Sequence, residues 1–174
     1  MNELKYPIGL YEPQLFSETQ KNKWIIDVAQ LPQQLEASLL NLDEAQLHTP
    51  YRPGGWTVQQ LVHHIADSHI NAFCRMKCTL TEDKPTIKAY EENLWAQQAD
   101  VDLPVNISTT ILHALHLRMV TLLKAVQPAE WDRTYIHPET GKENTLWYLL
   151  GMYAWHGRHH VAHIQALRQR EGWQ

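Results

Sequence analysis

The chain has 174 residues, of which 44% are hydrophobic and 20% are charged, as in an ordinary globular protein. Its formal net charge of −4 argues against a broad nucleic-acid-binding surface, which is usually basic. No apolar run approaches the ~20 residues of a membrane-spanning helix, and the first residues lack the apolar stretch of a signal peptide. We therefore expect one domain over residues 1–174, located in the cytoplasm, with no nucleic-acid or membrane partner.

The first predicted helix begins near Ser17, which has capping-box spacing with Gln20. Apolar residues follow at helical spacing from Trp24 to Leu31. Pro32 comes next, and a proline inside a helix removes one backbone hydrogen bond. We therefore expect a kink or a break at this position.

The second predicted helix begins at Thr57, which has the same capping-box spacing with Gln60, and it ends near Leu80. The connection that follows, 83–106, is long, and one helical turn is expected near its middle. A connection of this length inside a compact domain is usually functional or covers a site.

The third predicted helix begins at Ser108, and the loop after it holds a small hairpin over 134–142. The fourth begins at Asn144 or Thr145 and runs to about Arg170. Four long helices without long strands predict an all-α fold, a four-helix bundle. The long connections indicate a wiring other than simple up-down-up-down.

Histidines occupy the inward stripe of the fourth helix, within "WHGRHHVAH" at 155–163. His156 and His160 are four residues apart, so their Cβ atoms lie roughly 6 Å apart on one face. The HExxH metalloenzymes place two histidines on one metal with this spacing, although their glutamate is missing here. A metal pair and hydrogen-bonded core histidines are about equally supported by the spacing alone. His159 lies one residue off the stripe and is expected to face water or the rim.

The second helix carries a polar strip in which Asp67, Asn71 and Arg75 cluster around the direction of His64. An ordinary amphipathic helix shows the same pattern beside its apolar stripe. His63 points one residue step away, so the pattern favours His64 over His63 only slightly.

Four blocks of the sequence together resemble the YfiT group of the DinB-like four-helix bundles. The resemblance runs from Tyr6 to Trp173, and the blocks occur in order: "YPIG", "TPYRPGGWTVQQLVHHIADSHINAF", "LTEDKPTIKAYEE" and "YAWHGRHHVAHI". It implies one divalent metal ion per chain, held by three histidines. These are the second histidine of the "VHH" block, His64, and the HxxxH pair of the last helix, His156 and His160.

The same resemblance implies a metal-dependent hydrolase that forms a homodimer, and it places His163 where the family has a glutamine-like position. Three neutral imidazoles leave open positions on a metal, with zinc or nickel expected, for water or a small-molecule substrate. Such a metal activates water, holds a thiolate or polarises a carbonyl. Two alternatives therefore stay open: a transferase of a small, bacillithiol-like thiol, and a non-catalytic metal-binding bundle.

Several residues are expected to support this centre, although no catalytic acid or base is assigned. His163 and Asp67 are expected behind the ligands or as packing and surface groups. The residues expected to contact substrate, each with an ordinary packing or ion-pairing role as its alternative, are Arg52, Asn71, Arg75 and Tyr153.

Overall fold

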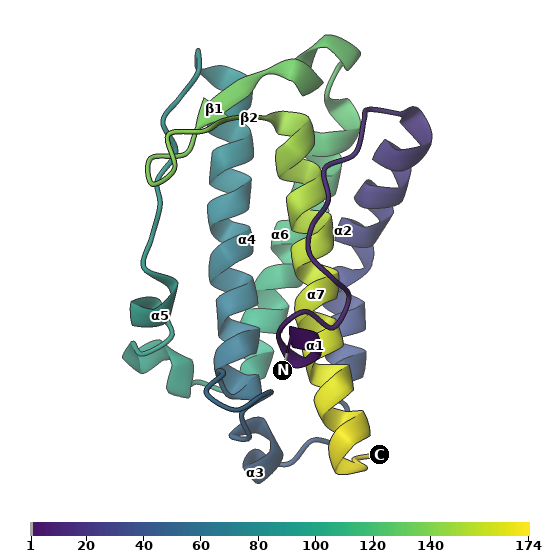
Figure 1. The fold of residues 1–174 in the computed structure, drawn as a ribbon, viewed down its shortest axis with the longest axis vertical. Helices are drawn as coiled ribbons and strands as arrows, with labels where there is room; N and C mark the ends of the chain where they lie inside the picture. The colour runs from purple at the N-terminus through teal and green to yellow at the C-terminus, as the bar shows by residue number, and fades with distance from the viewer. Residues whose placement is uncertain (1) are drawn as a thin grey trace.

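The computed structural model describes residues 2–174 and shows an all-α four-helix bundle, as the sequence predicts (Figure 1). The long helices are α2 (Glu18–Leu39), α4 (Val58–Thr81), α6 (Val105–Ala125) and α7 (Leu146–Glu171). The short elements are α1 (Asn2–Lys5), α3 (Glu44–Leu47), α5 (Glu92–Trp95), η1 (Ala99–Asp102), η2 (Pro128–Asp132), β1 (Thr134–Ile136) and β2 (Glu143–Thr145). Within the described residues, no helix has both the length and the apolar character needed to cross a membrane.

The helices are not wired up-down-up-down. Figure 1 shows α2 and α7 running in one direction and α4 and α6 in the other. Both α2 and α4 pack against α6 and α7. The connection 82–104 returns the chain along the bundle to the end where α4 began, so α4 and α6 are parallel. This arrangement confirms the expectation drawn from the long connections.

The helix starts follow their capping residues. Thr57 and Gln60 form the predicted capping box, and Ser17 accepts a hydrogen bond from the backbone N–H of Gln20. The prediction for α6 was wrong by three residues, because this helix begins at Val105, directly after a proline. Ser108, the expected first residue, is buried inside the helix instead.

The predicted hairpin is present and slightly displaced. Strands β1 and β2 pair antiparallel, with Tyr135 opposite Asn144. The second strand therefore lies just beyond the predicted range 134–142. Thr145 ends this strand and caps α7 by accepting a hydrogen bond from the backbone N–H of Tyr148.

Helix α2 is continuous across Pro32, so the predicted break is wrong. A proline leaves the carbonyl four residues earlier, here that of Val28, without its helical donor. The Nδ1 atom of His116, on α6, lies 2.5 Å from that carbonyl oxygen and supplies the missing hydrogen bond. A side chain of the neighbouring helix thus replaces the N–H that proline lacks.

The core is divided into two apolar clusters by a layer of histidines. One cluster lies toward the hairpin and includes Met76, Met119 and Leu146. The other lies toward the opposite end and includes Leu61 and Ile164. Between the clusters, α4, α6 and α7 carry His69, His116 and His156. The polar side chains are thereby concentrated at mid-height in the bundle.

Candidate metal centre

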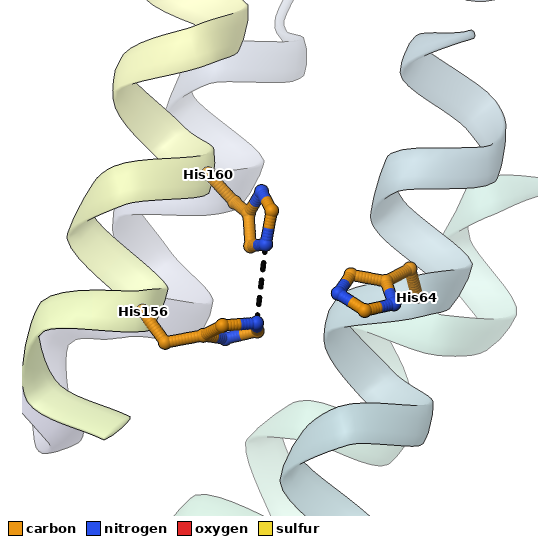
Figure 2. A group of neighbouring side chains, drawn as sticks. All are labelled: His64, His156 and His160. Carbon is orange, nitrogen blue, oxygen red and sulfur yellow. Dashed lines mark hydrogen bonds between the residues drawn. The ribbon is translucent and has the colours of Figure 1, made fainter. Parts of the chain in front are cut away.

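The three histidines singled out in the sequence meet between α4 and α7. His64 comes from α4, and His156 and His160 lie one turn apart on α7 (Figure 2). One ring nitrogen from each histidine lies within 4.8 Å of the others. The Nε2 atoms of His156 and His160 are 3.1 Å apart. The rings therefore converge on one small space, while their role as metal ligands stays a prediction.

Burial keeps these imidazoles neutral. Burial lowers the pKa of His64 to about 4. Burial, together with the neighbouring imidazoles, holds the pKa values of His156 and His160 well below their usual range. Near neutral pH each ring therefore has one nitrogen with a free lone pair, the form that a metal ion binds.

His160 is oriented from behind by His163. The Nε2 atom of His163 lies 3.1 Å from the carbonyl oxygen of Lys5 and must carry a proton, because a carbonyl only accepts. In neutral His163 the Nδ1 atom is then an acceptor, and it lies 3.4 Å from Nδ1 of His160. His160 therefore carries its proton on Nδ1 and turns the lone pair of Nε2 toward the convergence point. This is the arrangement that commonly supports a histidine ligand.

The donor set fits a divalent transition metal ion. Two Nε2 atoms facing each other at 3.1 Å, with the lone pair of His160 between them, suit a cation at their point of convergence. Imidazole nitrogens are ligands for zinc, nickel, copper and iron, whereas calcium and magnesium prefer oxygen. A second group, His159 with His160 and His163, is equally compact. In that group both nitrogens of His163 already have partners, so it fits a metal less well.

His159 does not face water, contrary to the prediction. It is 6% exposed, and its ring stacks on that of Trp155 with centroids 4.4 Å apart. Tyr6 covers it from the N-terminal segment, which crosses α7 at this level (Figure 1). The indole N–H of Trp155 donates to the carbonyl of Gly9 and holds the segment in place. A segment distant in sequence thus encloses a position that the helix alone would expose.

Asp67 lies in the wall of a cavity of about 720 Å³, one helical turn from His64. Asn71 lines the same cavity and donates to the backbone carbonyl of Asp67. The opposite wall comes from the long connection and includes Tyr90, Trp95 and Asp100. Burial, and then the charge of Asp100, raise the pKa of Asp67 to about 6. The long connection therefore covers a cavity whose wall includes a residue one helical turn from His64, whereas His64, His156 and His160 do not line it.

The other residues expected at the substrate make internal contacts. The guanidinium of Arg75 donates to the hydroxyl of Tyr153 and to the carbonyl of Lys88, tying the connection to the bundle. Arg52 lies over the ring of Tyr51, 5.3 Å from its centroid. None of these side chains except that of Lys88 is in the cavity wall. Their predicted contact with substrate stays a prediction.

Three further histidines lie outside the predicted ligand set. His63 turns toward α6, with Nδ1 2.8 Å from the hydroxyl of Ser108 and Nε2 2.9 Å from the carbonyl of Leu103. His69 and His116, which the sequence reading did not single out, are 0% and 2% exposed. The Nε2 atom of His69 lies 3.3 Å from Nδ1 of His156. Both lie on the apolar stripes of their helices, the signal that identified the histidines of α7.

Fold and site together define a helical bundle with a histidine centre at mid-height, and the comparisons agree. A sequence model of the DinB superfamily matches residues 28–164, and the chain belongs to this superfamily. The structure of YfiT from Bacillus subtilis is similar over 99% of both chains, with a TM-score of 0.96 and 42% identity. That protein is described as "a probable metal-dependent hydrolase with an unusual four-helix bundle topology".

Relatives from Bacillus mycoides and Bacillus cereus are 48% identical over 174 residues, covering 99% of this chain and 100% of each relative. Both carry the name "Putative metal-dependent hydrolase". The resemblance to the YfiT group drawn from the sequence blocks is therefore confirmed.

Proposed function

We propose that this protein is a metal-dependent hydrolase of a small molecule, with one zinc or nickel ion held by His64, His156 and His160. The observation that supports this best is the convergence of three neutral imidazoles, from two helices, within 4.8 Å. The names of the relatives support the same class of activity. When bound, the metal supplies Lewis-acid activation of water or of a carbonyl group.

Asp67 is the residue of this chain best suited to take up and release a proton. A general acid or base works best when its pKa lies near the working pH, and burial raises that of Asp67 to about 6. Asp67 and Asn71 line the same cavity. The volume of this cavity, about 720 Å³, suits a small-molecule substrate.

This candidate acid or base favours hydrolysis over thiol transfer. Transfer of a small thiol needs no group that takes a proton from water, whereas hydrolysis usually does. The thiol S-transferase and the non-catalytic bundle are therefore the alternatives that the experiment must separate.

The test begins with metal content, measured by mass spectrometry on protein purified without metal-affinity resin. His64→Ala, His156→Ala and His160→Ala are each expected to lose most of the bound metal, whereas the matched variant His113→Ala, at an exposed position, keeps it. Full metal occupancy in His156→Ala would refute the ligand set.

Activity is then measured on ester and amide substrates with and without an added small thiol. A hydrolase turns over with metal and water alone. Turnover only in the presence of thiol, with sulfur in the product, would replace hydrolysis by transfer. Two results together would indicate a structural metal. The absorption spectrum of the cobalt-substituted protein would not change when thiols, carboxylates or azide are added, and the protein would unfold when the metal is removed by a chelator.

A further inference from the structure

Three histidines and one backbone carbonyl form a row across the bundle, one from each long helix. The row leads from His156 on α7 through His69 on α4 and His116 on α6 to the carbonyl of Val28 on α2. It lies in the layer between the two apolar clusters. Buried polar groups in such a layer need partners, so the direction of each hydrogen bond can be worked out.

The far end of the row is fixed by Pro32. The carbonyl of Val28 only accepts, so the Nδ1 atom of His116, 2.5 Å away, must carry the proton. Burial lowers the pKa of His116 to about 4, so the ring is neutral and its Nε2 atom is an acceptor. That Nε2 atom is buried and has no hydrogen-bond partner among the described residues.

The next ring packs against that of His116. His69 stacks on His116 with centroids 4.9 Å apart, and its Nδ1 atom is likewise buried without a partner in the described part of the chain. The two rings are stacked at an interplanar angle of 24°, so an N–H in the plane of one ring does not point at a nitrogen of the other. No hydrogen bond joins them, and His116 contacts His69 by packing.

The Nε2 atom of His69 lies 3.3 Å from Nδ1 of His156. A neutral His156 that binds a metal through Nε2 carries its proton on Nδ1, and Nε2 of His69 then accepts a hydrogen bond from it. In that tautomer the Nε2 lone pair of His156 faces the space shared with His64 and His160.

We propose that His69, packed against His116, is a positioning residue that holds His156 in the tautomer able to bind a metal. The carbonyl freed by Pro32 holds His116 in place through its hydrogen bond. This inference rests on the metal centre proposed above, and it extends that centre from two helices to all four. Partners of this kind commonly contribute a factor of about 10–100 to metal affinity.

Two substitutions at one position separate positioning from packing. His69→Gln keeps an acceptor near the place of Nε2, whereas His69→Leu removes it at similar volume. Zinc affinity of the metal-free proteins is measured by competition with a chromophoric chelator. We expect His69→Leu to bind about 10–100 times more weakly and His69→Gln to stay close to wild type. If His69 only filled space, leucine would be tolerated at least as well as glutamine.

A matched control is His63→Leu, which removes another buried histidine with two hydrogen bonds from the same helix. It is expected to lower stability without a comparable loss of zinc affinity. Circular dichroism of every variant shows whether the bundle is folded. Equal zinc affinity in wild type and folded His69→Leu would overturn the proposal.

The tautomers provide a readout that needs no activity. Long-range ¹H–¹⁵N spectra of the zinc-loaded protein should show the proton of His156 on Nδ1, with Nε2 of His69 as its acceptor. A proton on Nε2 of His69 in the zinc-loaded protein would overturn the proposal even though zinc binds. If the wild-type protein binds no zinc, the proposed function fails; if it binds zinc and folded His69→Leu binds it equally well, only this proposal fails.

Discussion

His163 donates from Nε2 to the carbonyl oxygen of Lys5 across 3.1 Å, although the two residues are 158 positions apart in the chain. Its other nitrogen faces His160. The N-terminal segment and the candidate metal centre are therefore joined through a single imidazole. The orientation of one candidate ligand on α7, His160, depends on a backbone group that lies outside the bundle helices.

Replacing His163 should weaken metal binding without removing it. His163→Leu takes away the acceptor for His160 and the donor for Lys5, so we expect zinc affinity to fall by about 10-fold or more. Glutamine offers both a donor and an acceptor, so His163→Gln should remain near wild type. Chelator competition measures both variants. A larger loss, equal to that of His160→Ala, would mean that His163 is itself a ligand.

The metal-free protein should lose stability as the pH falls below about 6.5. Burial lowers the pKa of His64 and of His116 to about 4, so the unfolded chain takes up protons that the folded chain does not. Each such histidine contributes a slope of up to about 1.4 kcal/mol per pH unit between 6.5 and about 4. Asp67, with its raised pKa, acts in the opposite direction but is one group against several.

Urea unfolding followed by circular dichroism at several pH values between about 7 and about 5 measures this slope. The His64→Leu variant is a direct check, because it should show a shallower slope than wild type. A free energy of unfolding that is independent of pH over this range would contradict the buried, neutral state of the histidines.

Asp67 should set the acidic limb of the pH–rate profile. As a base it works when ionised, so kcat/KM should fall as the pH drops through about 6. Asp67→Asn should remove that limb and lower kcat by about 10²–10⁴, with metal content unchanged. Asp100→Asn should shift the limb to lower pH, because the charge of Asp100 helps to raise the pKa of Asp67. An unchanged profile in Asp67→Asn would rule out this role.

Pro32→Ala should separate helix stability from metal affinity. Alanine restores the backbone N–H that bonds to the carbonyl of Val28, and it favours a helix interior by about 3 kcal/mol over proline. The restored N–H competes with His116 for that carbonyl, so zinc affinity should decrease while thermal stability is maintained or rises. Pro138→Ala, at an exposed hairpin position, should change neither. Unchanged zinc affinity in Pro32→Ala would show that the hydrogen bond from His116 to the carbonyl of Val28 does not contribute to zinc binding.

Local patterns in the sequence predicted the helices and the face of the histidines. The capping pair of Thr57 and Gln60, and the four-residue spacing of His156 and His160, act within one helix, so sequence alone reveals them. The continuity of α2 at Pro32 and the burial of His159 depend on contacts with distant segments. No periodicity along one helix contains that information.

The roles of His69 and His116 were missed for a related reason. Each lies on the apolar stripe of its own helix, but the hydrogen bonds depend on how several helices are placed against one another. The single domain, the homodimer, the cytoplasmic location and the identity of the metal stay predictions, since they depend on properties beyond the chain's own contacts.

The connection 82–104 gives the cavity a wall that is independent of the four bundle helices. Reversing the direction of α6 requires a long excursion, and this excursion supplies the far wall of the cavity while contributing no bundle helix. Insertions and substitutions in it can therefore reshape the cavity without disturbing the two apolar clusters or the histidine layer.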